Sequence, residues 1–383
     1  MSSVRPVAID PLHDLSAYVE ALEAWLQQTP GCVDPVRRPI PSYPERVTAM
    51  VGLMAALHDA GWSRYGWPIE VGGLGGSIVH RAAMWETLAR HGVPGMALFE
   101  HLEILAPTLV AMGPRAFMAD ALPAFLAGRE LWAQGFSEPG SGSDLASLRT
   151  TAEAADGGYV VNGRKIWTSW ARYARWCLVL ARTGAPDSRH RGLTALIVDL
   201  EAPGVEVTAI AQANGTDELA EVTFDDVLVP VDRIVGDVDG GWRVAMHILS
   251  HERGTFAWFR HCFLYEHLRQ RVEHADCIHD TALGNAFLDL AAVSATGHAA
   301  LQAHAVEAPL GPRAAYTKLL LCAAEQSTND WILASDPDLA IDVLDDEVAI
   351  RRQDYLFSRI VTVYGGSQQM QLETIAKQIL RLP

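Results

Sequence analysis

One carboxylate interrupts an apolar helical face and is the first candidate for chemistry in this chain. The apolar residues at helical spacing after Gly241 are Ala245, Ile248, Leu249, Phe256 and Phe259. Glu252 falls within that face, where an ionised carboxylate is unfavourable unless it is paired or used. Burial would raise its pKa toward neutrality, as a general base requires. The alternative is a structural carboxylate, paired with an arginine or placed at the rim of the core. The adjacent Arg253 projects about 100° away around the helix, so it is not an automatic partner.

Two short blocks between Leu131 and Trp170 are rich in hydroxyl groups. They read Trp132-Ala-Gln-Gly-Phe-Ser-Glu-Pro-Gly-Ser-Gly-Ser-Asp144 and Asn162-Gly-Arg-Lys-Ile-Trp-Thr-Ser-Trp170. The glycines and serines of the first block allow a tight turn that presents N–H and O–H donors, and the second block has the composition of a strand. Between them, Asp156-Gly157-Gly158 predicts a hairpin turn. Together the blocks could hold a flat heterocycle with polar edges, with Trp167 facing it, or they could be two ordinary loops of a β-domain.

Other motifs give weaker signals. His274, Cys277 and His279 are close in sequence but do not share a helix face, so no metal site is predicted. The glycines of segment 72–76 lack the Lys-Ser/Thr of a phosphate loop and predict a turn between helices. No Gly-x-Ser-x-Gly elbow is found, so an α/β-hydrolase nucleophile is not indicated.

The periodicity of the chain predicts three regions. Before residue 130, helical spacing is found in 15–26, 47–60, 78–91 and 102–112, with a proline-rich break around Pro35 to Pro44. From Leu131 to about residue 238 the period is two, and after it helices return, the first running from Trp242 to about His274. We predict an α+β multi-domain chain: an N-terminal helical domain at 1–130, a central antiparallel β-domain at 131–238, and a C-terminal helical bundle at 239–383. A doubly wound sheet is disfavoured because strands and helices do not alternate.

The composition limits the classes of molecule that the protein is expected to bind. The net charge of −16 argues against nucleic acid and anionic membranes, because both require a basic face. The five cysteines are widely spread and form no Cys-x-x-Cys pair, which favours a reducing cytoplasm over a disulfide framework. No apolar run reaches the roughly 20 residues of a membrane span, and no signal peptide is visible. We therefore expect a cytoplasmic protein.

With these residues in view, the sequence resembles the acyl-CoA dehydrogenase family over nearly its whole length. The first block is similar to the family's Thr/Ser-Glu-Pro-x-x-Gly-Ser-Asp signature, and Asn162-Gly-x-Lys-x-Trp-Thr-Ser169 to its flavin-facing strand. Phe224-Asp-Asp-Val-x-Val-Pro230 with Gly240-Gly241-Trp242 resembles the exit from its β-domain. Tyr364-Gly-Gly-Ser-Gln-Gln-Met-Gln371 resembles its C-terminal signature. Four ordered motifs at family spacing are a far stronger signal than any one of them.

The resemblance implies FAD as the cofactor and α,β-dehydrogenation of an acyl-CoA thioester as the reaction. A carboxylate would remove the α-proton while the β-hydride passes to the flavin, with the thioester carbonyl stabilised by hydrogen bonds. An electron-transfer flavoprotein or a similar acceptor would then reoxidise the flavin. By position, the residues implied to bind FAD are Gln134, Phe136, Ser137, Gly142, Ser143, Trp167, Thr168, Ser169, Ser367 and Gln369.

The family places its catalytic glutamate in one of two positions. In many members it directly follows the tyrosine of the C-terminal signature, and here that position is Gly365. Other members carry a Glu-Arg pair on the first helix after the β-domain, and here that pair is Glu252-Arg253. The resemblance and the interrupted apolar face therefore point to the same base, Glu252. Arg253 would hold the helix or the CoA end of the substrate.

The sequence departs from the family pattern at positions that concern the oligomeric assembly and the class of substrate. The Arg-x-x-Phe-Gly stretch that reaches a neighbouring subunit's FAD is not found after Arg260, and Leu372 stands where arginine is usual. A homo- or hetero-tetramer is expected, and a non-identical partner could complete the flavin site. The pattern looks most like actinobacterial members that act on bulky acyl chains, including steroid side-chain esters. Two alternatives are a non-catalytic or FAD-sharing subunit of a heteromeric dehydrogenase, and a flavin monooxygenase on the same fold.

Overall fold

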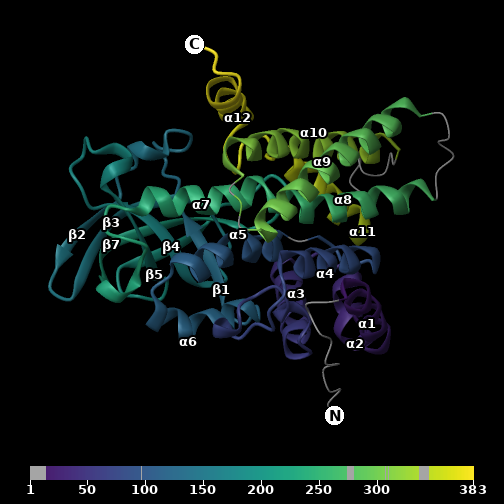
Figure 1. Ribbon diagram of the computed structural model, residues 1–383, viewed down its shortest axis with the longest axis horizontal. Coiled ribbons are helices and arrows are strands. Elements are labelled where there is room, and N and C mark those ends of the chain that lie inside the picture. The colour runs from purple at the N-terminus through teal and green to yellow at the C-terminus, as the bar shows by residue number, and fades with distance from the viewer. Residues whose placement is uncertain (1–13, 96, 274–279, 307, 309, 336–344) are drawn as a thin grey trace. The chain divides into compact units, whose positions relative to one another are not determined.

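The chain forms two units in the computed structural model, which describes residues 14–95, 97–273, 280–306, 308, 310–335 and 345–383 (Figure 1). The first unit combines Met1–Glu100 with Ser250–Pro383 and is called the helical unit below. The second is His101–Leu249, called the sheet unit. The predicted order of helices, strands and helices is confirmed, and with it the α+β class. The boundaries of the three predicted domains remain predictions.

The N-terminal helices follow from local sequence signals. They are α1 (Leu15–Gln28), α2 (Pro30–Arg37), α3 (Tyr43–Asp59) and α4 (Ile78–Arg90). The Asp14 carboxylate caps α1 by accepting a hydrogen bond from the N–H of Ala17 at 3.0 Å. The expected proline-rich break is partly wrong, because α2 includes Pro35. Pro30 occupies the first turn of α2, where a missing N–H costs nothing.

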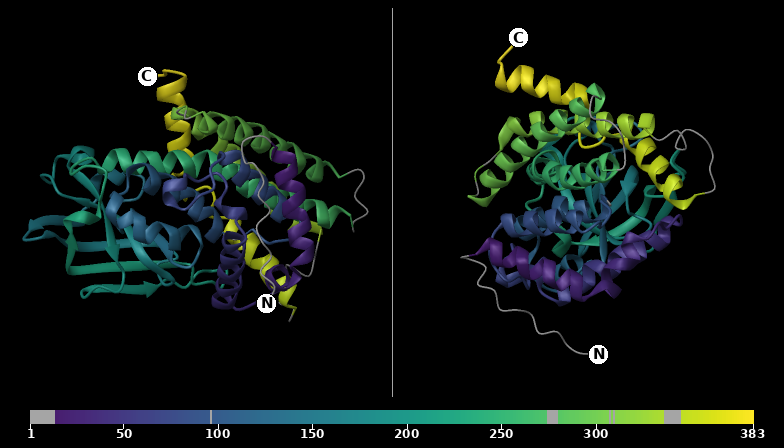
Figure 2. Two further views of the ribbon diagram at one scale, coloured as in Figure 1. Left: turned by 60° about the horizontal axis from the view of Figure 1, so that its bottom comes forward. Right: turned by 90° about the vertical axis from the view of Figure 1, so that its right-hand side faces the viewer.

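The C-terminal helices confirm the expected bundle and correct one boundary. They are α7 (Gly241–Arg253), α8 (Thr255–Val272), α9 (Thr281–Ala305), α10 (Ala314–Ser335), α11 (Asp346–Ser358) and α12 (Gln368–Thr374), followed by a π-helical turn (Ile375–Ile379). The helix predicted from Trp242 to about His274 is wrong as one element, because it breaks at Gly254. A Cβ there would lie 2.4 Å from the Leu310 side chain. Helices α8, α9 and α10 pack side by side (Figures 1 and 2).

The sheet unit is built on eight strands, preceded by α5 (Ala97–Met112) and α6 (Arg115–Leu126). The strands are β1 (Leu131–Gly135), β2 (Thr151–Ala155), β3 (Gly158–Ser169), β4 (Ala174–Arg182), β5 (Leu193–Asp199), β6 (Val205–Ala209), β7 (Leu219–Pro230) and β8 (Ile234–Val235). Their order is β6-β7-β3-β2-β4-β5-β8, with β1 beside β4. Most pairs are antiparallel as predicted, while β1 and β2 both run parallel to β4. The hairpin expected at Asp156–Gly158 joins β2 to β3.

The core of the sheet unit comes from alternate residues of its longer strands. Val161, Cys177, Val198, Val222 and Phe224 are all buried in one cluster. This packing fixes the register of β3 and β4, which carry or flank the hydroxyl-rich blocks.

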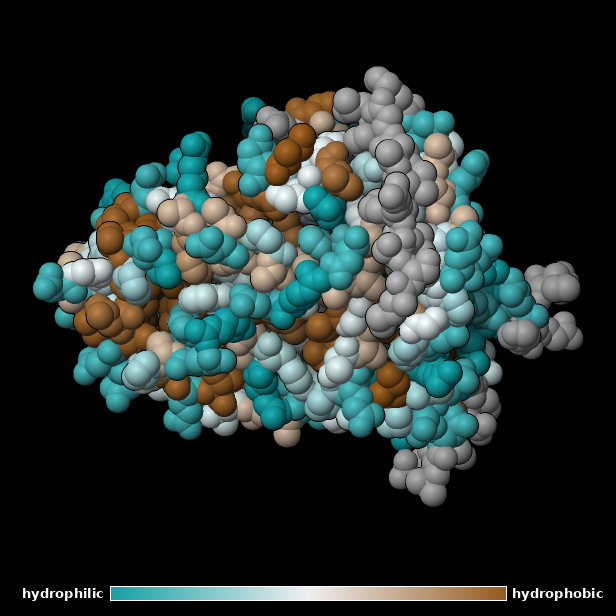
Figure 3. Space-filling view, turned by 90° about the horizontal axis from the view of Figure 1, so that it is seen from below, coloured by the Kyte–Doolittle hydropathy of each residue, from teal (hydrophilic) through white to brown (hydrophobic). Residues whose placement is uncertain are grey.

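On the face drawn in Figure 3, apolar residues form patches among polar ones. None of the helices in the described part of the chain combines the length and the apolar composition that a membrane span requires.

Candidate active site

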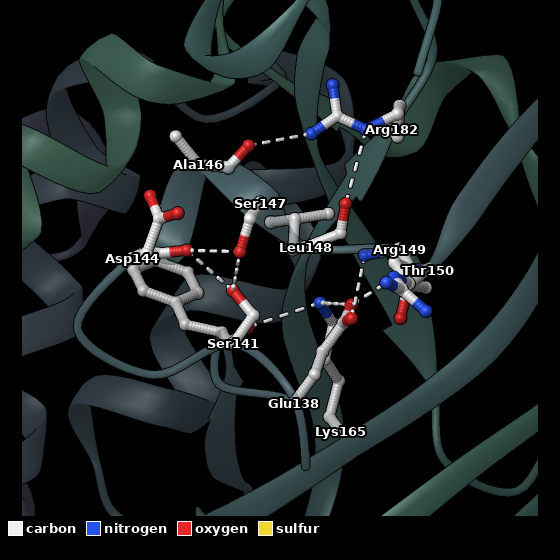
Figure 4. Close-up of polar contacts among 11 residues, drawn as sticks. Glu138, Ser141, Asp144, Ala146, Ser147, Leu148, Arg149, Thr150, Lys165 and Arg182 are labelled. Atoms are coloured by element: carbon white, nitrogen blue, oxygen red, sulfur yellow. Dashed lines mark hydrogen bonds and ion pairs between the residues drawn. The ribbon is translucent and has the colours of Figure 1, made fainter. Parts of the chain in front are cut away.

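The loop after β1 is held by its own hydrogen bonds. Glu138 and Ser141 exchange backbone bonds, with N···O distances of 2.9 and 3.0 Å, which close a tight turn over Pro139 and Gly140. The hydroxyls of Ser141 and Ser147 both donate to the carbonyl of Asp144, at 2.8 and 2.7 Å (Figure 4). These hydrogen bonds between groups of the same segment stabilise the turn that the loop makes.

Glu138 anchors this loop to the rest of the sheet unit. Its carboxylate accepts hydrogen bonds from the N–H groups of Arg149 and Thr150, at 2.7 and 2.8 Å, and from Lys165 Nζ at 2.8 Å (Figure 4). Burial alone would raise the pKa of Glu138, but the Lys165 charge and these donors hold it below its ordinary value. The Lys165 ammonium is fully buried and also donates to the carbonyl of Phe136 at 3.2 Å. Burial lowers the pKa of Lys165 to about 8, with Glu138 opposing that shift.

The Glu138–Lys165 pair is a structural feature that the sequence reasoning missed. Each residue belongs to one of the two hydroxyl-rich blocks, and the pair joins them in the interior. A signal was present, since the first block carries two acidic residues, Glu138 and Asp144, and the second carries two basic residues, Arg164 and Lys165. It could not be read without knowing that both side chains point into the core, because a one-residue shift in register reverses that direction.

The structure brings the predicted flavin residues of the two blocks together. The carbonyl of Ser137 accepts a hydrogen bond from the N–H of Ile166 at 3.0 Å, which places the first block against the second. Gln134 is half-buried on β1 and Phe136 is buried, while Gly142 and Ser143 are exposed at the loop tip. These residues and the 167–169 segment therefore belong to one continuous part of the sheet unit.

The end of β3 is distorted at the residues expected to face the flavin. The pairing of β3 with β7 shifts register between Lys165 and Thr168, and Trp167 adopts a left-handed backbone with a φ of 60°. This conformation is unfavourable for a bulky residue and is typical of functional sites. The Trp167 side chain is 56% exposed, whereas Thr168 is fully buried. Among the described residues, the Thr168 hydroxyl has no hydrogen-bond partner. Ser169 is half-buried beside it.

In the helical unit, Glu252 lies in the last turn of α7, next to the break at Gly254. Its side chain is partly covered, and the oxygen Oε2 is shielded from solvent without a hydrogen-bond partner among the described residues. Burial raises the pKa of Glu252, and the charges of Lys318 and Arg253 oppose that shift. An unsatisfied carboxylate oxygen with a raised pKa is the electrostatic setting of a general base.

The C-terminal signature forms a turn against Glu252 and Arg253. A Cβ at Gly365 would lie 2.9 Å from Glu252 Oε1, and Gly365 has a φ of +65°. Arg253 Nε donates to the carbonyl of Gly365 at 2.9 Å. Gly366 has a φ of +92°, and a Cβ there would lie 2.7 Å from Arg253 Nη2. The two positions at which the family is expected to place its glutamate, 252 and 365, are thus in contact.

The remaining predicted residues lie beside this turn or elsewhere in the helical unit. Ser367 caps α12, its hydroxyl accepting from the N–H of Met370 at 3.3 Å, and Gln369 is exposed in the first turn of the same helix. Arg260 makes a buried two-point ion pair with Glu325, at 3.2 and 2.9 Å, and is structural. The weak metal candidates His274, Cys277 and His279 lie outside the described residues.

Comparison with known proteins gives consistent matches along the chain. Residues 37–129 match the family model described as the acyl-CoA dehydrogenase N-terminal domain, and residues 133–227 match the middle domain. The acyl-CoA dehydrogenase IpdE1 of Mycobacterium tuberculosis is 38% identical over 334 residues, which cover 85% of this chain and 86% of that protein.

Two solved structures share the fold. The ChsE4–ChsE5 complex from Mycobacterium tuberculosis has a TM-score of 0.74 at 25% identity, covering 98% of this chain and 100% of that chain. The Tcur3481–Tcur3483 steroid ACAD has a TM-score of 0.77 at 24% identity, with coverage of 98% and 100%. The similarity therefore extends to both units.

Proposed function

Because this chain belongs to the acyl-CoA dehydrogenase family of oxidoreductases, we propose that it dehydrogenates an acyl-CoA thioester between the α and β carbons, with FAD as cofactor and Glu252 as base. The observation that carries the proposal is the shielded Oε2 of Glu252 beside the Gly365 turn, which has no hydrogen-bond partner in the described part of the chain. A structural carboxylate would be expected to have donors, as Glu138 does.

The sheet unit has groups that fit a flavin. Among the described residues the buried Thr168 hydroxyl has no hydrogen-bond partner, and the Trp167 indole is exposed on a strained backbone. Gly142 in the loop after β1 leaves room for close approach. We propose that Gln134, Phe136, Ser137, Gly142, Ser143, Trp167, Thr168 and Ser169 bind FAD, with Ser367 and Gln369 as further contacts. The bound flavin would supply the acceptor for the hydride that leaves the β carbon.

Glu252 would take the proton from the α carbon. Its Oε2 has a free lone pair, and shielding from water keeps the carboxylate poorly solvated and therefore basic. Arg253 is tied to the Gly365 carbonyl and so positions the turn beside the base. The proposal assigns Arg253 a positioning role, since its Nε is committed to the backbone.

Anaerobic mixing with acyl-CoA esters tests this function directly. The FAD-loaded protein should lose its oxidised flavin absorbance with at least one ester of a panel that includes bulky, steroid-derived acyl groups. Glu252→Gln should bind the ester and FAD but slow flavin reduction by a factor of about 10² to 10⁴, the usual contribution of a general base. Glu347→Gln, an exposed glutamate of the same unit, is the matched control and should behave as wild type. A fully loaded wild type that no ester reduces would refute the proposal.

A heteromeric, FAD-sharing assembly is the second candidate. Leu372 stands where the family usually has arginine and is 52% exposed. The Arg260 side chain forms an ion pair with Glu325 of the same chain. The name of the fold neighbour ChsE4–ChsE5 describes a complex of two proteins. Flavin content discriminates the two assemblies: a homo-oligomer should hold about one FAD per chain alone, whereas a shared site should gain flavin only on co-expression with a homologous partner. An electron-transfer flavoprotein is the proposed acceptor and should reoxidise the reduced protein.

A further inference from the structure

The chain contains only three lysines, Lys165, Lys318 and Lys377, although it has 30 basic residues of lysine or arginine type. Two of the three are buried, with Lys165 0% and Lys318 1% exposed. Lys165 is explained by its ion pair with Glu138. The ammonium of Lys318, on α10, has no hydrogen-bond partner among the described residues. Burying an ammonium group whose N–H donors have no acceptor costs free energy, so its presence in the core calls for a physical reason.

The groups around Lys318 leave one carboxylate uncommitted. The ammonium lies 3.8 Å from the centre of the Tyr364 ring, a favourable cation–π contact. The Cys322 thiol, one turn later on α10, donates to the carbonyl of Val361 at 3.2 Å. The Glu325 carboxylate is held by Arg260 through two bonds. Burial lowers the pKa of Lys318, and the nearby acidic groups oppose that shift. Glu252 is the remaining one of these groups, and its Oε2 also has no hydrogen-bond partner among the described residues.

Lys318 and Glu252 meet the same short turn of the chain. Lys318 stacks on Tyr364, while Glu252 lies against the next residue, Gly365. Arg253, whose charge also acts on the pKa of Glu252, is tied to the Gly365 carbonyl. On the neighbouring helix α9, His304 stacks on His251 with ring centres 4.4 Å apart, so these two imidazoles are engaged with each other. Of the cations around Glu252, Lys318 alone lacks a hydrogen bond among the described residues.

We propose that Lys318 is a positioning residue that keeps Glu252 ionised through its buried positive charge, without a direct hydrogen bond that would consume the lone pair of the base. The role in catalysis rests on the proposed function, whereas the charge coupling does not. A hydrogen-bonded cation would neutralise Glu252 as Lys165 does Glu138, and so weaken it as a base. A cation that stacks on an aromatic ring lowers the free-energy cost of ionising the shielded carboxylate through its charge alone. It leaves Oε2 available to accept a proton.

The scarcity of lysines makes the coupling measurable without activity. In protein labelled with ¹³C at lysine Cε, only three side-chain resonances are expected, and each reports the charge of its own ammonium. Glu252→Gln should move the titration of Lys318 to lower pH, because the carboxylate that stabilises the ammonium is gone. The Lys165 and Lys377 resonances should not move, which also shows that the fold is intact. Glu138→Gln is the mirror control and should move Lys165 alone, while Lys377→Arg assigns the exposed residue.

Kinetics then test the consequence for the base. In Lys318→Met the acid limb of flavin reduction should move to higher pH, so that the rate at about pH 6 falls at least about tenfold while the rate at about pH 9 recovers. Lys318→Arg should retain the wild-type profile in large part, because it keeps the charge.

Two results would overturn the inference. One is an identical Lys318 titration in wild type and Glu252→Gln, and the other is a Lys318→Met rate reduced equally at all pH values. A wild type that no acyl-CoA reduces, together with a coupled Lys318 titration, would instead refute the proposed function and leave the charge coupling standing.

Discussion

The buried Glu138 and the partly covered Glu252 are both shielded from solvent, with opposite consequences for their pKa values. Glu138 has three donors on its carboxylate, so its pKa lies below the ordinary value. Glu252 has a shielded oxygen with no donor among the described residues, so burial prevails and its pKa is raised. The number of hydrogen bonds to the ionised form, rather than burial itself, separates a structural carboxylate from a candidate base.

Glu138→Gln should destabilise the sheet unit strongly. It leaves the Lys165 ammonium buried without its counter-charge, and removing one partner of a buried pair typically costs about 3–5 kcal/mol. Urea denaturation followed by tryptophan fluorescence measures the loss. Asp144→Asn is the matched control, since its pair with Arg189 is exposed and should contribute about 0–1 kcal/mol. Equal effects of the two substitutions would contradict the anchoring role of Glu138.

Glu252→Gln should stabilise the protein at neutral pH even as it removes activity. With its folded pKa above the unfolded one, Glu252 binds a proton more tightly in the folded state, so its ionisation lowers stability as pH rises through that range. The stability difference between variant and wild type should therefore grow from acid to neutral pH. Denaturation curves at several pH values measure it, and a difference that shrinks with rising pH would count against the raised pKa.

At the distorted end of β3, one substitution can distinguish an effect on stability from an effect on FAD binding. Thr168→Val replaces a buried hydroxyl that has no partner among the described residues, so the FAD-free protein should keep its stability. If that hydroxyl bonds FAD, affinity should fall by a factor of about 3 to 10, the value of one hydrogen bond. Fluorescence titration with FAD measures it. An unchanged dissociation constant would remove Thr168 from the proposed flavin site.

The turn at Gly365 limits the space available to the Glu252 side chain at the end of α7. Gly365→Ala places a Cβ 2.9 Å from Glu252 Oε1 on a left-handed backbone, so it should displace the carboxylate as well as add about 1–2 kcal/mol of strain. Gly311→Ala is the matched control, because Gly311 is also left-handed, with a φ of +55°, but a Cβ there meets nothing within 4 Å. Both variants should lose similar stability, and only Gly365→Ala should slow flavin reduction. Equal rates would show that Glu252 tolerates displacement.

For the molecule as a whole, the two units carry different parts of the proposed chemistry. The sheet unit holds the loop after β1 and the distorted strand, and the helical unit holds Glu252, Lys318 and the Gly365 turn. Hydrogen exchange with and without FAD should show protection in peptides covering 136–144 and 166–169, because a ligand that binds the native state suppresses local opening. The peptide covering 366–370 tests Ser367 and Gln369 separately. Protection confined to other segments would require a different flavin site.

Local patterns were enough to predict much of this protein. The order of helical and strand regions, the hairpin at Asp156–Gly158 and the polar break in the apolar face at Glu252 all follow from periodicity and turn chemistry, which act over a few residues. The resemblance to the family followed from motif order, and the comparisons confirm it.

The tertiary structure decided which charges meet. The contact of Glu252 with Gly365, the Glu138–Lys165 pair and the stacking of Lys318 on Tyr364 all join residues that are distant in sequence. Whether a buried charge is an anchor, a base or a tuning group depends on the donors that the fold brings to it, and those donors come from other elements. Sequence spacing identifies the charge, while only the packed chain supplies or withholds its partner.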